Sequence, residues 1–241
     1  MTDEITATLL KDRTTGRNII WATEELGAVE ITPDDICKII PRHAKNRADQ
    51  KRRTRARAEI FTPPEVCRIQ NDLVCKPFEK RFDDFIDAKF LEITCGEAPY
   101  ITSRNNAVTG EYIAPENRVG LLDRKFRLIG NTKPVDTLTL RALKSVYGYE
   151  FQGDNLFLAR RNIFDTVAEF LTSKLAAQEL REILPTVAEI ISWNFWQMDG
   201  LKYSPPFTDN ANLFGGANCQ IMDWDANEPL EFVELIGGGR R

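Results

Sequence analysis

Strand patterns that alternate with helix patterns are the feature of this sequence that most constrains its fold. Four short apolar runs are typical of buried strands: residues 88–94, 145–151, 188–195 and 218–224. Residues 155–171 follow the second run and repeat apolar side chains on one face of a helix. Because neighbouring parallel strands need a crossover connection, this alternation predicts an α/β fold with a parallel sheet.

Composition limits the classes of protein to which the chain can belong. With 241 residues, of which 42% are hydrophobic, the chain can bury one main core. No window approaches 18 uninterrupted apolar residues, so no membrane span is expected. Five cysteines without a CxxC pair, and a single histidine, His43, argue against a zinc site or a disulfide framework. We therefore expect no metal and a reducing, cytoplasmic compartment.

Changes in pattern predict four parts along the chain. Residues 1–45 contain a hairpin pattern at 7–23 and then a helix that begins at Thr32 and ends at Pro41. Residues 46–59 read as a basic connector or helix, and residues 237–241 as a tail. The α/β domain is expected over residues 60–236, with a first helix capped by Thr62.

Basic side chains are concentrated just before this domain. Residues 42–57 hold eight Lys or Arg side chains and one acid, Asp49. One interpretation is a solvated helix face, and the other is a helix that contacts nucleic-acid phosphates. The second interpretation assigns DNA contacts to Arg52, Arg53, Arg55 and Arg57.

Polar side chains are expected where the strands end. Glu92 ends the first strand and is followed by a Cys95-Gly96 turn, Glu150 ends the second, and Asn194 with Phe195 ends the third. In parallel sheets, ligands bind outside the carboxyl ends of the strands. A strand-end acid suits ribose hydroxyls, and an amide beside an aromatic ring suits adenine. These groups predict an adenosine-bearing ligand.

The order of these motifs resembles a known enzyme family. Phe61-Thr62-Pro63, residues 92–98 (EITCGEA), Tyr149-Glu150 and Asn194-Phe195 resemble the S-adenosylmethionine-dependent adenine-N6 DNA methyltransferases of restriction-modification systems. The stretches LEITCGEAPY, GLLDRKFR, YGYEFQGDNL and SWNFWQMDGLK resemble compact methylase subunits of those systems. The resemblance covers roughly residues 60–230.

The resemblance implies a Rossmann-like class I methyltransferase sheet, with S-adenosylmethionine as cofactor and DNA as substrate. It assigns the methionine part of the cofactor to Phe61, Thr62 and Pro63, and the ribose to Glu150. It assigns adenine to Asn194 and Phe195, and the cradle around the cofactor to Glu92, Cys95, Gly96 and Ala98. Ile93 stands where the family has proline and Ala98 where it has glycine, so weak cofactor affinity is expected.

The catalytic motif of such enzymes, Asp/Asn/Ser-Pro-Pro-aromatic after the fourth strand, has two candidates. Asp223-Trp224 follows the fourth strand pattern but lacks both prolines. The alternative, Ser204-Pro205-Pro206-Phe207, matches the letters, although eight residues after Phe195 leave no room for a crossover and a strand. Each also has a structural interpretation, as a core tryptophan beside a loop acid and as a proline-rich surface loop.

Segment lengths predict an incomplete sheet and a partner. Glu92 and Glu150 lie far apart for a strand-helix-strand unit, which places an insertion at about residues 100–138, polar and hairpin-like, as a lid or partner surface. Only residues 230–236 offer a further strand, so either the N-terminal hairpin completes the sheet or an edge is left open. No segment remains for target recognition, which implies a specificity or nuclease subunit, or a homodimer.

Three functions follow from these observations. The first is a DNA adenine-N6 methyltransferase or modification subunit of a restriction-modification or phage-related system. The second is a catalytically inactive methyltransferase-like binding or scaffold protein in phage defence or counter-defence. The third, a nucleotide-cofactor enzyme such as a dehydrogenase, is disfavoured because the sequence has no GxGxxG motif.

Overall fold

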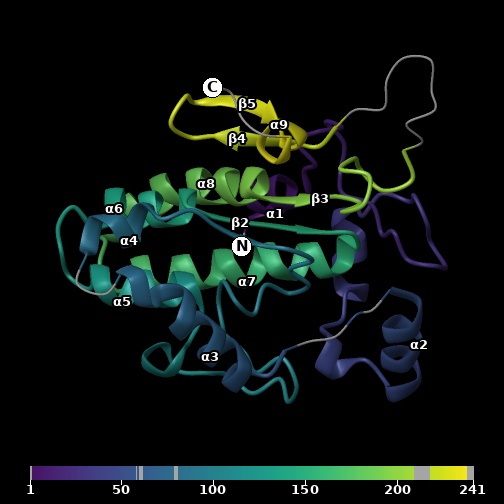
Figure 1. The fold of residues 1–241 in the computed structure, drawn as a ribbon, viewed down its shortest axis with the longest axis horizontal. Coiled ribbons are helices and arrows are strands. Elements are labelled where there is room, and N and C mark those ends of the chain that lie inside the picture. Colours follow the sequence, from purple (N-terminus) through teal and green to yellow (C-terminus); the bar gives the residue numbers. More distant parts are fainter. Residues whose placement is uncertain (1, 58, 60–61, 79–80, 209–217, 238–241) are drawn as a thin grey trace.

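Three parallel strands form the central sheet of the computed structural model. The structure describes residues 2–57, 59, 62–78, 81–208 and 218–237. Strands β1 (Phe90–Glu92), β2 (Val146–Glu150) and β3 (Phe195–Gln197) are hydrogen-bonded in the order β1-β2-β3. The α/β architecture with a parallel sheet is therefore confirmed (Figure 1). We call the end of the sheet at Glu92, Glu150 and Gln197 the carboxyl edge, and the opposite end the amino edge.

The third strand lies later in the chain than the sequence pattern predicted. Residues 188–194 belong to helix α8 (Ala177–Asn194), and β3 starts only at Phe195. Val187, Ile190 and Ile191 are buried at helical spacing, so the apolar run is the inner face of a helix. A short apolar run does not by itself distinguish a buried strand from a buried helix.

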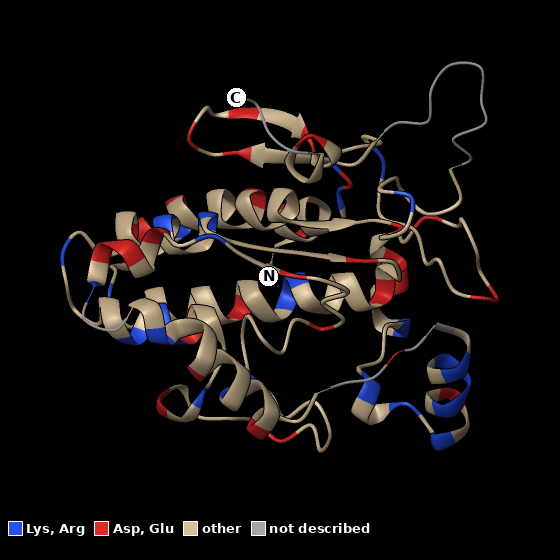
Figure 2. Ribbon diagram, viewed as in Figure 1, with Lys and Arg blue, Asp and Glu red and all other residues tan. Residues whose placement is uncertain are grey.

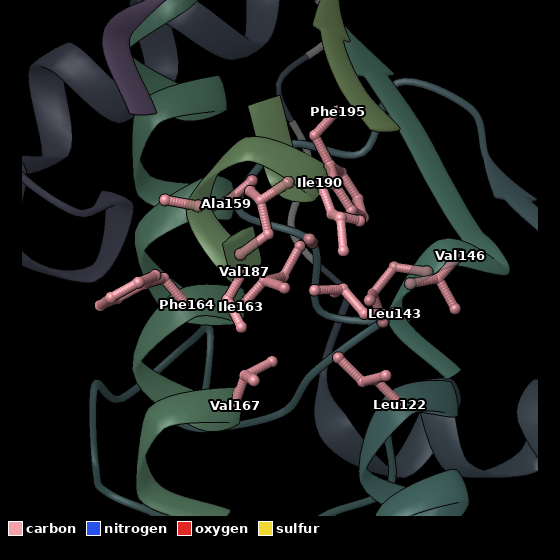
Figure 3. Close-up of a cluster of buried hydrophobic side chains, with 14 of the residues drawn as sticks. Leu122, Leu143, Val146, Ala159, Ile163, Phe164, Val167, Val187, Ile190 and Phe195 are labelled. Atoms are coloured by element: carbon pink, nitrogen blue, oxygen red, sulfur yellow. The ribbon is translucent and has the colours of Figure 1, made fainter. Parts of the chain in front are cut away.

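Helices cover one face of the sheet. The predicted amphipathic helix is confirmed as α7 (Gly153–Thr172), which packs against α8. Helices α5 (Leu121–Ile129) and α6 (Val135–Lys144) complete this side. Figure 3 shows how their side chains meet those of the strands in one core, which includes Leu122, Leu143, Val146, Ala159, Ile163, Phe164, Val167, Val187, Ile190 and Phe195.

A separate hairpin covers the other face. Strands β4 (Gln220–Asp223) and β5 (Glu228–Glu231) pair antiparallel, and α9 (Phe232–Ile236) follows them. The fourth predicted strand therefore exists but does not join the parallel sheet, and most of the strand predicted at 230–236 is helical. Aromatic side chains attach the hairpin to the sheet, with the rings of Trp196 and Phe232 5.2 Å apart.

The N-terminal region is helical where a hairpin was predicted. Residues Asp3–Leu10 form α1, and the predicted hairpin is reduced to a short antiparallel turn that pairs Leu10 with Ile19, Lys11 with Asn18 and Asp12 with Arg17. Side chains of α1 lie in the same core as α7 and α8, so residues 1–45 do not have a core of their own. The predicted helix after Thr32 is the 3-10 helix η1 (Pro33–Lys38).

The segments between the N-terminal region and β2 are also mostly helical. The basic block contains η2 (Arg42–Ala44) and α2 (Arg47–Arg57). The next helix is capped by Pro63 instead of Thr62. The insertion predicted as hairpin-like has an antiparallel bridge, between Asn105 and Tyr112, followed by a 3-10 helix and α5, which begins where the Gly120 amide donates to Asp123. The remaining elements are α3 (Pro64–Cys75), η3 (Lys76–Phe78), α4 (Phe82–Asp87) and η4 (Pro115–Asn117).

Within the described ranges, no helix has both the length and the apolar character that a membrane crossing requires.

Candidate functional site

Glu150 holds the carboxyl edge together through backbone amides. Its Oε2 accepts a hydrogen bond from the Gly96 amide at 2.9 Å, and its Oε1 accepts from the Phe151 and Gln152 amides at 3.0 Å each. The side chain is buried, and this burial raises the pKa of the carboxyl group. Glu150 thus joins the turn after β1 to the turn after β2, and most of its acceptor capacity is used inside the fold.

Glu92 differs from Glu150 because one of its oxygens has no partner. Its Oε2 is buried, and none of the described residues hydrogen-bonds to it. Its Oε1 lies 3.5 Å from the Tyr100 amide, a weak contact, and the backbone amides of Tyr100 and Ile101 both favour the charged form of the carboxyl group. Burial, with the Glu150 charge as a minor cause, raises the pKa of Glu92 well above its ordinary value. A buried, unpartnered carboxyl oxygen at a strand end has the character of a ligand contact.

The turn after β1 has an unusual backbone. Thr94, Gly96 and Ala98 all have positive φ, at 48°, 56° and 59°. Ala98 is fully buried in this left-handed conformation, which glycine adopts more readily than alanine. Cys95 is buried as well, and desolvation raises the pKa of its thiol, so it is a packed side chain and not a nucleophile.

Asn194 and Phe195 lie at the amino edge, and the prediction that they meet Glu150 at one edge is wrong. Asn194 Nδ2 donates to the carbonyls of Leu143, in the last turn of α6, and Val146, at the start of β2, at 3.1 and 2.9 Å. Phe195 is fully buried in the core. The error follows from the helix that was read as a strand: Asn194 precedes β3 and does not end it.

Asp223 and Trp224 are also remote from the carboxyl edge. Trp224 Nε1 donates to Asn194 Oδ1 at 2.7 Å, which places this ring at the amino edge. Asp223 Oδ1 accepts from the amides of Asp225 and Ala226 and so closes the β4-β5 turn. The first candidate catalytic pair therefore lies at the end of the sheet opposite to Glu92.

Ser204-Pro205-Pro206-Phe207, in contrast, lies next to the carboxyl edge. The Asp199 amide donates to the Ser204 carbonyl at 2.8 Å, so the chain folds back directly beyond β3 without a crossover. The Phe207 ring is half exposed and lies 5.8 Å from Phe151, which follows β2. This turn explains the short spacing after Phe195. It also places an acid that the sequence reading did not single out, Asp199, beyond the end of β3.

A cavity of about 390 Å³ opens beside this loop. Pro205, Pro206 and Phe207 line this cavity together with Gln197 at the end of β3. Polar residues of the N-terminal region, among them Asp12, Asn18 and Glu30, also line it. The cavity therefore combines an exposed aromatic ring with hydrogen-bonding groups, as binding sites for small polar ring systems do.

The N-terminal region covers the rest of the carboxyl edge. Gln197 pairs with both backbone groups of Ile20: its Oε1 accepts from the amide at 2.8 Å, and its Nε2 donates to the carbonyl at 2.7 Å. The Gly153 amide at the start of α7 donates to the Trp21 carbonyl at 3.1 Å. The positions where a ligand would approach β2, β3 and α7 are thus occupied by the chain itself.

The residues assigned to DNA contacts are not equivalent. Arg53 is mostly buried and is paired with Asp154 at 2.9 Å and with Glu59 at 2.5 Å. Arg52 is partly exposed and pairs with Glu25, whereas Arg55 is exposed. Arg57 ends α2. Figure 2 shows basic residues along α2. Because Arg53 is mostly buried, only part of the basic block faces solvent.

The segment before α3 completes the set of predicted residues. Phe61 lies outside the described residues, Thr62 is partly exposed, and Pro63 is exposed at the start of α3. Helix α3 is attached to the chain after the β1 turn, since Asn71 Nδ2 donates to the carbonyls of Tyr100 and Val119 at 3.0 Å each.

Not all the residues assigned to S-adenosylmethionine are free to contact that cofactor in this arrangement. Glu92 has an unused oxygen, but Glu150 is bonded to amides and Asn194 lies at the other edge. In the part of the chain that the structure describes, no three His, Cys, Asp or Glu side chains gather as they would around a metal ion. Neither a protein-family model, nor a curated protein, nor a solved structure matches this chain.

Proposed function

We propose that this chain is the modification subunit of a DNA-modification system of the restriction-modification type, with adenine-N6 methyl transfer from S-adenosylmethionine as its reaction. The observation that carries the proposal is that Glu92 and the Ser204–Phe207 loop lie at the same edge of a parallel sheet, beyond β1 and β3, with β2 between them. Open parallel sheets bind their ligands at this edge. The proposed site is the carboxyl edge once the N-terminal region has moved away from it.

The Ser204–Phe207 loop has the groups that an extruded base needs. The Phe207 ring offers an exposed face for stacking, and enzymes that act on DNA bases read the extruded base by stacking and hydrogen bonds. Ser204 Oγ is buried and has no hydrogen-bond partner among the described residues. Both features support this loop over Asp223 and Trp224 as the base-holding element.

A partner subunit, or a second copy of the chain, belongs to this proposal. The parallel sheet has three strands in the described residues, and β1 is one of its outer strands. Leu91 on β1 is 45% exposed although its neighbours Phe90 and Tyr147 pack against the protein. An exposed apolar side chain on an outer strand suits a contact with another chain.

A catalytically inactive methyltransferase-like binding protein is the second candidate. The three hydrogen bonds that Glu150 accepts from backbone amides favour this inactive candidate. A carboxylate that stabilises the turns of its own chain is poorly placed to bind a ribose. The N-terminal region covers Gln197 and Gly153, which also favours the inactive candidate.

A methyl-transfer assay distinguishes the two candidates. Tritiated S-adenosylmethionine and mixed-sequence duplex DNA are supplied with and without candidate partner subunits, and calorimetry with the demethylated cofactor measures binding. We expect transfer to DNA adenine, and Phe207→Ala should lower its rate by about ten- to a hundredfold, since stacking on an aromatic ring contributes about 1–3 kcal/mol. Leu201→Ala, in the same turn but 94% exposed, serves as the control and should leave the rate unchanged.

The absence of both binding and transfer with every partner would support the inactive candidate. If methyl transfer occurs and Phe207→Ala leaves its rate unchanged, the chain is an enzyme but this loop does not hold the base.

A further inference from the structure

The element that closes the carboxyl edge is a continuous segment, residues 18–57, which we call the strap. It touches the edge through two adjacent residues: Ile20 pairs with Gln197 at the end of β3, and the Trp21 carbonyl accepts from the Gly153 amide at the start of α7. The fit at Gly153 is tight. A Cβ atom on Gly153 would lie 2.0 Å from the Ile20 carbonyl oxygen, so only glycine permits this contact.

A buried cluster of charges holds the far end of the strap. Arg53 on α2 contacts Glu59 and Asp154, and these side chains are 11%, 3% and 4% exposed. Lys45 adds a longer contact to Asp154 at 3.7 Å, and Arg42 lies 3.5 Å from Glu59. Asp154 sits in the first turn of α7, next to the glycine that the other end of the strap covers. Separating such a pair leaves a buried charge without its partner, so the cluster holds α2 against α7.

Helix α2 carries further cations on its outer side. Arg47, Lys51 and Arg55 are exposed, whereas Arg53 faces the body of the protein. The basic residues of α2 lie away from the sheet in Figure 2. The closed strap therefore offers solvent only part of its positive charge.

We propose that the strap is an autoinhibitory element that closes the ligand-binding edge in the free chain and is released by a nucleic-acid backbone. A ligand shifts a conformational equilibrium only when it binds one state more tightly. The open strap adds Arg53 and Lys45 to the cations already exposed, and phosphate is a strong acceptor for Arg that competes with Glu59 and Asp154. The inference rests on the proposed function for the identity of the polyanion as DNA.

Hydrogen exchange at the Ile20 amide, whose partner is Gln197, reports directly on the strap. Gly153→Ala pushes the Ile20 carbonyl away without changing any charge, and alanine in the first turn of α7 favours the helix. We expect the Ile20 amide to exchange at least about tenfold faster in this variant, while the Val167 amide in the middle of α7 stays protected. Arg53→Met should have the same effect, and Arg52→Met, one residue away and partly exposed, should have none.

Duplex DNA added to the unchanged protein tests the release. We expect faster exchange at Ile20 with a 20-base-pair duplex at low salt, and no effect at high salt, because phosphate contacts weaken as salt rises. Unchanged or slower exchange at Ile20 with DNA would overturn the release. An unchanged exchange rate of the Ile20 amide in Gly153→Ala would overturn the proposal that the strap closes this edge. This test holds even if the Arg53→Met variant does not fold.

These hydrogen-exchange measurements do not depend on methyl transfer. A chain whose strap opens but which transfers no methyl group contradicts the proposed function alone. A chain that is active while its Ile20 amide stays protected contradicts the strap alone.

Discussion

At the scale of single residues, buried polar side chains connect segments that are distant in the sequence. Arg160 on α7 is fully buried and has no carboxylate partner among the described residues in hydrogen-bond contact. Its guanidinium donates to the carbonyls of Leu9, Lys11, Ser192 and Phe195. Burial lowers the pKa of Arg160 to about 10, which still leaves it charged at neutral pH. One side chain thus connects the end of α1, the end of α8 and the start of β3.

Replacing Arg160 should therefore be far more damaging than replacing its neighbour. We expect Arg160→Met to lower the free energy of unfolding by at least about 3 kcal/mol, since several buried carbonyls lose their donor. Arg161→Met removes only a half-exposed pair with Asp165 and should change it by less than about 0.5 kcal/mol. Urea unfolding of both variants measures this difference. Equal unfolding midpoints for Arg160→Met and Arg161→Met would show that water takes over the hydrogen bonds that the Arg160 guanidinium donates.

At the scale of elements, α8 shows how packing overrides local propensity. The helix continues through Pro185, which has no N–H to donate to the Arg181 carbonyl and is exposed on the outer side. Its inner face, with Val187, Ile190 and Ile191, is buried in the core. Tertiary packing of that face stabilises a helix that proline weakens.

Pro185→Ala should accordingly stabilise the protein. We expect the free energy of unfolding to rise by about 1–3 kcal/mol, because alanine restores the missing hydrogen bond and no packing is lost at an exposed position. Thermal unfolding measures the change, with the neighbouring Thr186→Ala as control. A lower melting temperature for Pro185→Ala would mean that a proline kink positions the inner face of α8.

At the scale of the whole molecule, the N-terminal region and the sheet share one core. Leu9 and Leu10 of α1 are fully buried together with residues of α7 and α8. Trp21 and Ile31 belong to the same cluster. Trp21 and Ile31 therefore hold the first part of the strap in this core, and the buried charge cluster around Arg53 holds its end.

A shared core predicts a single unfolding transition. We expect the transitions followed by circular dichroism and by tryptophan fluorescence to coincide in urea, and Leu9→Ala to shift both by about 2–5 kcal/mol. Leu73→Ala, on the outer side of α3 and 67% exposed, should shift neither by more than about 0.5 kcal/mol. An early transition confined to the N-terminal region would show that residues 1–45 fold on their own.

The sequence alone determined those features that depend on neighbouring residues. The parallel α/β plan, β1, β2, the long helix α7 and the Cys95-Gly96 turn were all predicted, since apolar periodicity and glycine placement are local signals. Where a pattern was ambiguous, as at residues 188–195, one misread helix moved Asn194 from the amino edge to the carboxyl edge.

Only the tertiary structure decided what surrounds the strand ends. Glu150 was read as free for a ligand, yet it binds the amides of Gly96, Phe151 and Gln152. Arg53 was read as a DNA contact, yet it pairs with Asp154, 101 positions further along the chain. The partners of a buried charge come from distant segments, and a sequence shows the charge without its partner. For this protein, the chain determined which groups its strand ends carry, and long-range contacts decided which of them are covered.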